Sequence, residues 1–168
     1  MREILFKAKL KDWQTNPQHD IWVEGFYLSR KETTYCFKED YEKFPVKTLH
    51  FIAEDCMTDW GLPNDFRLYE IDPDTLCQHT GMVDKNGNAI WENDVVEFES
   101  IGYIPNTQTG QVAFYNGSWC IRYLYWGYKL GFHRIGSVDS WQEMGASGTI
   151  TYEYKKVGNI FDDNQTRV

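Results

Sequence analysis

The chain has 168 residues, of which 42% are hydrophobic and 17% aromatic, and its formal net charge is −8. This composition excludes intrinsic disorder, and the many aromatic rings favour β-strands, whose pleated, half-buried surfaces suit large side chains. The acidic balance, with basic residues scattered along the chain, argues against nucleic acid as a partner, because phosphate binding needs clustered Lys and Arg. No apolar run approaches the roughly 18 residues of a membrane helix, so no membrane association is expected.

Cysteine usage and the N-terminal residues predict a cytoplasmic protein. The cysteines are Cys36, Cys56, Cys77 and Cys120, and none of them form a CxxC pair. The opening residues turn charged again at Lys7 before an apolar core of signal-peptide length can form, so no signal peptide is expected. Reduced cysteines in the cytoplasm are therefore the simplest interpretation.

The first part of the chain predicts short strands separated by polar turns. Residues 2–10 alternate in polarity, and residues 21–29 are apolar and aromatic, both of which are typical of strands. Residues 33–37 are the expected hairpin partner of 21–29, across a turn at 30–32. The other expectations are a loop at 11–20, a charged segment at 38–43 and a strand at 46–52.

One short helix is expected in the first half of the chain. Residues 54–62 are the best candidate, and Pro63 ends it because proline cannot continue a helix. Residues 66–71 alternate again and predict a strand, which the sequence Asp72-Pro73-Asp74 closes.

Residues 76–98, LCQHTGMVDKNGNAIWENDVVEF, concentrate turn chemistry and polar side chains. Asn86-Gly87 predicts a type I′ hairpin turn, in which both central residues need positive φ. The alternative is a calcium loop, whose first three ligands would be Asp84, Asn86 and Asn88. That loop needs glycine at its sixth position and glutamate at its twelfth, where this chain has Ala89 and Val95, so no metal is expected.

The second half predicts another hairpin and two final strands. Residues 111–115 and 118–125 are expected to pair across a turn at Asn116-Gly117. Residues 137–148 are ambiguous between one helical turn and a break in structure. The other expectations are loops at 100–110 and 127–136, strands at 149–154 and 156–161, and a polar tail at 162–168.

Three polar side chains are candidates for chemistry. Glu92 and Asp94 alternate along an expected strand and so point to one face, as an acid–base pair or a Mg²⁺ site requires. His79 lies on one strand face with Cys77, and with the two carboxylates it suggests metal-assisted hydrolysis. The plainer interpretation is a solvated strand face or hydrogen bonds to a turn, and no catalytic residue is assigned.

An aromatic block offers a second kind of candidate site. Stacked rings can bind bases or sugars, but without basic residues beside them packing in a core or a subunit interface is the expected role. The block consists of Trp119, Tyr123, Tyr125, Trp126 and Tyr128.

Residues 78–96, QHTGMVDKNGNAIWENDVV, resemble the signature QYTGLxDKNGxxI[YF]EGDIV of YopX-like proteins. Three more segments are similar to family motifs and occur in the same order: MREILFKA at 1–8, YEIDPDTL at 69–76 and VGNIF at 157–161. His79 replaces the family's Tyr. Asn93 replaces its Gly, at a bend that Asn can also form because it tolerates positive φ. The ending at 163–165, DNQ, departs from the family's NPELL.

The resemblance implies a phage or prophage protein of the bacterial cytoplasm, with a β-rich fold and self-association. It implies no accepted enzymatic activity and no cofactor. It also implies that the segment is an architectural signature, and the corner Asn93-Asp94-Val95-Val96 is similar to the GDxV corner of SH3-like barrels. The signature residues are Thr80, Gly81, Asp84, Asn86, Gly87, Glu92, Asn93 and Asp94.

Together these observations predict a mainly β protein with an N-terminal β extension, residues 1–75, and a small SH3-like or partly open antiparallel barrel, residues 76–168; one continuous domain is the alternative. The expected function is that of a non-enzymatic accessory module, which binds an unknown host or phage protein or self-assembles into a homo-oligomer. The alternatives are a metal-assisted hydrolase that uses Glu92, Asp94 and His79, and a nucleic-acid-associated small barrel.

Overall fold

The computed structural model describes residues 3–100, 106–125, 129–135, 139–143, 146–150 and 153–162. The prediction of a mainly β protein is confirmed, and the strands of its sheets pair antiparallel. Over these residues the sheets are open and form no closed barrel. The chain divides into two compact units, Met1–Gln78 (unit 1) and His79–Val168 (unit 2). Two separate domains with a boundary at residue 75 stay a prediction.

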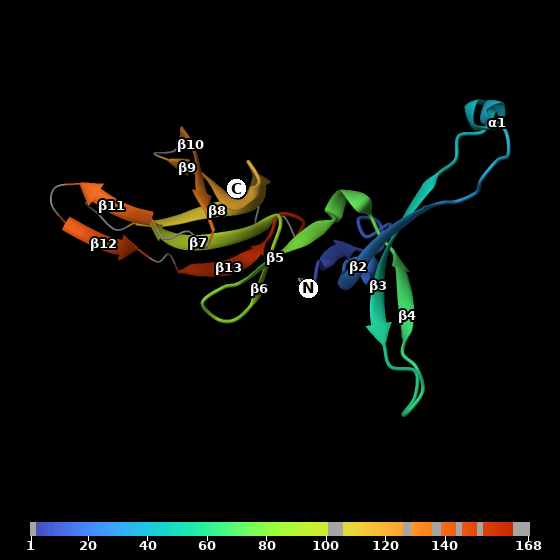
Figure 1. The fold of residues 1–168 in the computed structure, drawn as a ribbon, viewed down its shortest axis with the longest axis horizontal. Coiled ribbons are helices and arrows are strands. Elements are labelled where there is room, and N and C mark those ends of the chain that lie inside the picture. Colours follow the sequence, from blue (N-terminus) through green and yellow to red (C-terminus); the bar gives the residue numbers. More distant parts are fainter. Residues whose placement is uncertain are drawn as a thin grey trace. The chain divides into compact units, whose positions relative to one another are not determined.

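Unit 1 is built on an antiparallel sheet in the order β4-β3-β2-β1 (Figure 1). Its elements are β1 (Phe6–Lys9), η1 (Pro17–His19), β2 (Trp22–Lys31), α1 (Lys38–Lys43), β3 (Thr48–Cys56), β4 (Asp65–Glu70) and η2 (Pro73–Thr75). The two halves of β2 have different neighbours, because residues 22–25 pair with β1 and residues 26–31 with β3. Gly25 lies at the changeover with a φ of 155°, and a Cβ there would collide with the carbonyl oxygen of Ala53.

One face of the unit 1 sheet forms its hydrophobic core. Side chains alternate along each strand, and the buried Ala8, Val23 and Ile52 all fall on this face. Ile71 completes the cluster after β4, and partly buried side chains such as Tyr27 pack around it. The opposite face of the sheet carries the alternate residues of the same strands, such as Phe26 and Leu68.

Residues 33–37 do not form the predicted hairpin with 21–29. Strand β2 runs through the predicted turn at 30–32 as far as Lys31 and pairs with β3 instead. The connection between β2 and β3 contains α1, a short helix formed by the charged segment 38–43. The sequence correctly predicted strands at the positions of β2 and β3. It paired β2 with residues 33–37, which form no strand, and not with β3.

The predicted helix at 54–62 is also wrong. Strand β3 continues to Cys56, and residues 57–64 make the turn into β4. Buried Ile52 and Ala53 hold β3 in the sheet. A short helix that contains Gly61 would gain too few hydrogen bonds to offset the cost of nucleation.

Unit 2 is built on an antiparallel sheet in the order β10-β9-β8-β7-β13 (Figure 1). Strand β5 (Cys77–Val83) begins beside β1 in unit 1 and continues into unit 2, where it pairs with β6 (Ala89–Trp91). The other strands are β7 (Asp94–Ser100), β8 (Asn106–Tyr115), β9 (Ser118–Tyr125), β10 (Lys129–Arg134), β11 (Asp139–Glu143), β12 (Ala146–Ile150) and β13 (Tyr154–Asn159).

The core of unit 2 lies along the central strands of this sheet. Ile90, Val96, Val112 and Ile121 are fully buried, and each comes from a different strand. Trp119 and Tyr123 of the aromatic block pack against this cluster, as expected for core side chains. The side chain of Tyr125 and the whole of Trp126 and Tyr128 lie outside the described residues.

The predicted hairpin at 111–125 is confirmed. Strands β8 and β9 pair across Asn116 and Gly117, whose φ values of 48° and 77° are both positive, as a type I′ turn requires. The expected loop at 100–110 is wrong at its end, because β8 already begins at Asn106; residues 101–105 lie outside the described residues. Over 137–148 the structure shows strand pairing of β11 with β12 where a helical turn was one alternative.

Across the part of the chain that the structure describes, no helix is both long enough and apolar enough to cross a membrane.

Candidate functional site

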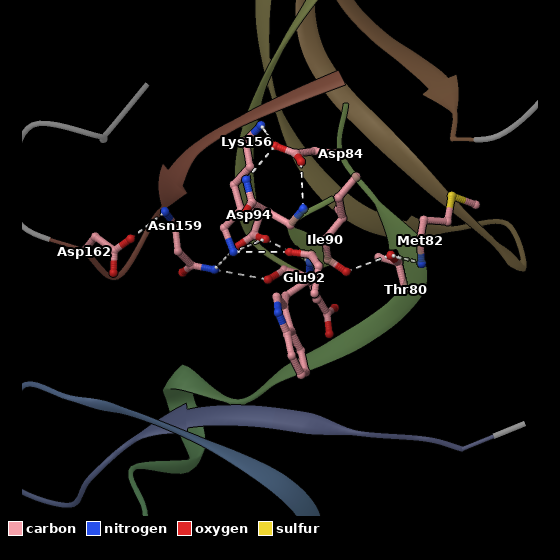
Figure 2. A network of polar contacts seen from close by, with 12 residues as sticks. Thr80, Met82, Asp84, Ile90, Glu92, Asp94, Lys156, Asn159 and Asp162 are labelled. Atoms are coloured by element: carbon pink, nitrogen blue, oxygen red, sulfur yellow. Dashed lines mark hydrogen bonds and ion pairs between the residues drawn. The ribbon is translucent and has the colours of Figure 1, made fainter. Parts of the chain in front are cut away.

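The signature segment builds a buried polar network in unit 2 (Figure 2). The loop between β5 and β6 contributes Asp84, and the corner between β6 and β7 contributes Asp94. Strand β13 contributes Lys156 and Asn159, which come from near the end of the described chain. Asp84, Asp94 and Asn159 have relative exposures of 5%, 0% and 0%, so the polar atoms of this network are shielded from water.

Asp84 organises the loop between β5 and β6. Its Oδ1 accepts the backbone N–H groups of Asn86 and Asn88, each at 2.8 Å. The N–H of Gly87 donates to the Asp84 carbonyl at 3.0 Å, and Gly87 has a φ of 84°. Asn86 does not have positive φ, so the predicted type I′ turn is wrong. The loop is a β-turn that ends in a left-handed glycine. After the two-residue loops with type I′ or II′ turns, this is the commonest kind of hairpin connection.

Hydrogen bonding also controls the ionisation of Asp84. Burial would raise the pKa of this carboxyl, but bonds from the Asn88 backbone, the Asn88 side chain and the Lys156 and Asn86 backbones outweigh it and lower the pKa from 3.8 to about 2. The Lys156 N–H reaches Oδ2 at 3.1 Å from a strand 72 residues away in the sequence. Asp84 therefore fixes its own loop and fastens that loop to β13.

Asp94 organises the corner between β6 and β7. Its Oδ2 accepts the Trp91 N–H at 2.8 Å and lies 3.0 Å from the Nζ of Lys156. Its Oδ1 accepts Nδ2 of Asn159 at 2.9 Å. This carboxylate is fully buried, and its oxygens have a backbone N–H, a side-chain amide and an ammonium group as partners. It thereby holds three segments together.

Asn159 closes the network from β13. Its Nδ2 also donates to the Glu92 carbonyl at 3.3 Å, and its Oδ1 accepts the Phe161 N–H at 3.1 Å. Its own N–H donates to Asp162 Oδ2 at 2.8 Å (Figure 2). One side chain thus bonds both to the corner before β7 and to the turn that follows β13.

Lys156 is the residue that sequence reasoning missed. Its backbone binds Asp84 and its side chain pairs with Asp94, so both signature aspartates converge on it. The Nζ also donates to the Ala89 carbonyl at 3.3 Å. No motif marked this lysine, because its role depends on a register between β7 and β13 that pattern alone does not reveal.

The structure places the other signature residues in supporting positions. Thr80 is buried, donates its hydroxyl to the Ile90 carbonyl at 2.7 Å and accepts the Met82 N–H at 3.2 Å. Gly81, with a φ of 83°, lies within the irregular register of β5 against β6. These contacts shape the strand that leads into the Asp84 loop.

The three candidates for metal-assisted hydrolysis have different surroundings. The ring of His79 lies 4.8 Å from the ring of Trp91, centroid to centroid, and Glu92 is half-buried at the corner. Asp94 is turned toward Lys156 and Asn159. Among the described residues, no three His, Cys, Asp or Glu side chains are grouped so that they could hold a metal ion.

The family model described as YopX protein matches residues 13–165, which is nearly the whole chain. The chain belongs to the YopX family. No curated protein matches it. The resemblance of the signature segment to YopX-like proteins is thereby confirmed. In this YopX protein, Asp84 and Asp94 of the signature form the centre of the buried polar network.

The YopX signature of this chain departs from the usual pattern at Asn93, and the bend survives. Asn93 has a φ of 64°, as its tolerance of positive φ predicted. Its N–H donates to the Val112 carbonyl at 2.9 Å, and its carbonyl accepts the Ile160 N–H at 3.1 Å. Its side-chain Oδ1 accepts Nε2 of Gln111 at 2.8 Å, a contact that a glycine at this position could not make. The departure at 163–165 lies outside the described residues.

Acid is expected to weaken unit 2 through Asp84. The pKa of this group is lowered on folding, so its stabilisation is complete above about pH 5 and is lost as the pH falls through 2, at most about 2.5 kcal/mol. Urea unfolding of wild type and Asp84→Asn at about pH 5 and pH 2.5 tests this: the wild type should lose more stability on acidification than the variant. Asp74→Asn, at an exposed carboxylate, should behave like wild type. Equal losses in wild type and Asp84→Asn would contradict the assignment.

Proposed function

We propose that this YopX-family protein is a cytoplasmic accessory protein of phage or prophage type that acts by binding another protein and not by catalysis. Exposed apolar side chains in unit 1 carry the proposal. Single exposed apolar side chains are common in soluble proteins, but several that lie close together often mark a binding surface. The buried signature network supports the same conclusion, because it engages Asp84 and Asp94 in structural contacts.

Five of the exposed apolar residues of unit 1 lie in one stretch, between the end of β3 and the middle of β4, and others, such as Phe37 and Phe44, are exposed elsewhere in the unit. Trp60 is the extreme case, with a relative exposure of 92%. Tryptophan is a favoured anchor of protein interfaces, since one ring buries a large area with few rotatable bonds. The other members of the stretch, each more than half exposed, are Met57, Leu62, Phe66 and Leu68.

Affinity capture followed by reconstitution tests this proposal. The tagged protein is expressed in a bacterial host, captured partners are identified by mass, and each is purified and mixed again with the protein. The expected result is a stoichiometric complex that Trp60→Ser weakens about tenfold or more, as loss of an interface anchor does. Val83→Ser, at a residue in unit 2 that is 61% exposed, is the matched control and should bind normally.

The contrary result is catalytic turnover. If a screened substrate class were hydrolysed, and Asp94→Asn abolished that activity while circular dichroism showed an intact fold, the protein would be an enzyme and the proposal would be wrong.

A further inference from the structure

The face of the unit 1 sheet opposite the core carries a contiguous apolar patch. Residues directly opposite in antiparallel strands share a face, and Ala53 lies opposite both Phe26 and Leu68. Phe66 shares this face two residues before Leu68, and its ring meets that of Phe26 edge-on with centroids 6.3 Å apart. Phe66 and Leu68 are 57% and 52% exposed. The name β4 face is used below for these four residues: Phe26, Ala53, Phe66 and Leu68.

In the part of the chain that the structure describes, β4 is the last strand of the sheet on this side, so the β4 face continues to a strand edge. The Ile71 N–H donates to the His50 carbonyl at 3.0 Å. Alternate residues of an antiparallel strand bond to the same neighbour, so the backbone groups of Phe66 and Leu68 point away from β3. An edge of this kind can accept a strand from another chain.

The open part of this edge is short and centred on Leu68. At one end, Oδ1 of Asp65 accepts the Phe66 N–H at 2.8 Å. At the other end, the Lys11 N–H donates to the Glu70 carbonyl at 3.0 Å. Between these two caps, the backbone around Leu68 offers room for a few residues of an added strand.

The chain that surrounds the β4 face is acidic. Residues 54–70 contain five carboxylates, Glu54, Asp55, Asp59, Asp65 and Glu70, against one cation, Arg67, which lies between Phe66 and Leu68 in β4. Asp55 lies opposite Phe66 and therefore on the β4 face itself, Asp59 lies within the connecting turn, and Asp65 is the first residue of β4 after that turn. Charges of one sign around an apolar surface attract a partner of the opposite sign and repel one of the same sign.

We propose that the β4 face binds a short extended segment of a partner protein, with apolar residues at its centre and Lys or Arg beside them. This rests on the proposed function and names its surface and its partner chemistry. The apolar side chains pack on Phe66 and Leu68, the backbone adds to the edge at Leu68, and the cations reach the carboxylates near the turn. A second copy of this chain fits less well, because the chain has a net charge of −8 and a second copy would bring another acidic surface to this edge.

Two labelled peptides test this chemistry. Both have a centre of alternating valine and threonine; one has lysines at both ends and the other has glutamates there. Fluorescence anisotropy with the full chain should show binding of the lysine peptide, weakened by added salt, and at least tenfold weaker binding of the glutamate peptide. Leu68→Lys should weaken the lysine peptide about tenfold or more. Val83→Lys adds the same charge to an exposed strand residue of unit 2 and should leave its binding unchanged.

Several results would overturn the inference. The first is absence of binding by the lysine peptide, and the second is equal binding of the two peptides or equal behaviour of the two variants. The third is self-association of the wild type in sedimentation that Leu68→Lys abolishes, which would make a second copy the occupant. A reconstituted partner that binds wild type and Leu68→Lys equally would also remove the β4 face as the site, yet it would leave the proposed function standing.

Discussion

Replacing Asp94 by alanine is expected to destabilise the protein by about 3–5 kcal/mol, the cost of breaking a buried ion pair from one side. The change leaves the Lys156 ammonium, the Asn159 amide and the Trp91 N–H without their buried acceptor. Urea unfolding followed by circular dichroism measures the effect as a lower midpoint for the transition of unit 2.

Glu97 is the matched control for this change. It lies in the same strand, β7, and pairs with Lys155 at 3.2 Å, but its side chain is 38% exposed. Exposed ion pairs contribute about 0–1 kcal/mol, so Glu97→Ala should leave the midpoint almost unchanged. If Asp94→Ala and Glu97→Ala proved equally mild, the buried network could not be what holds this corner.

Gly25→Ala is expected to destabilise unit 1 by about 3 kcal/mol or more, because overpacking and a strained φ combine. A Cβ at this position collides with the Ala53 carbonyl oxygen, which is backbone and cannot rotate aside. The collision forces β2 away from β3 at the point where β2 changes neighbours. The measurement is the thermal midpoint of the variant compared with wild type.

Gly87→Ala separates collision from backbone strain. Gly87 also has positive φ, at 84°, but no atom lies within 4 Å of the place that a Cβ would take. Its alanine variant should lose only about 1 kcal/mol, the usual cost of a left-handed conformation for a residue with a Cβ. A Gly25→Ala variant no less stable than Gly87→Ala would show that β2 and β3 do not approach closely there.

Local patterns in the sequence predicted the local structure well. Alternation identified β1 and β4, and Asn116-Gly117 identified a type I′ turn, because each of these signals depends only on residues a few positions apart. The same logic misjudged Asn86-Gly87. There the loop is set by Asp84, whose side chain takes up the amides of Asn86 and Asn88 and selects a longer turn.

Long-range pairing could not be predicted from pattern. Two family motifs, residues 78–96 and 157–161, were matched separately, and nothing in either one says that Asp94 and Asn159 meet across 65 residues. The pairing of β2 with β3 was missed for the same reason: hydrophobic alternation specifies a face, not a neighbour. Tertiary contacts determine both the meeting of Asp94 with Asn159 and the pairing of β2 with β3.

The exposed apolar stretch of unit 1 can be recognised in the sequence. Met57, Trp60 and Leu62 occupy a turn-forming stretch with Gly61 and Pro63, where large apolar side chains have no local core to enter. Apolar residues in such a turn support the proposed binding surface. The polar residues of the YopX signature are explained by their buried contacts as part of the architecture.

A double-mutant cycle between Asp94 and Asn159 tests most directly that the YopX signature is a structural device. The free energy of unfolding is measured for wild type, Asp94→Ala, Asn159→Ala and the double variant. The predicted result is that the two losses are strongly non-additive, with a coupling of about 1–3 kcal/mol, because each side chain is the buried partner of the other. Strictly additive losses, or an Asp94→Ala protein as stable as wild type, would contradict the account.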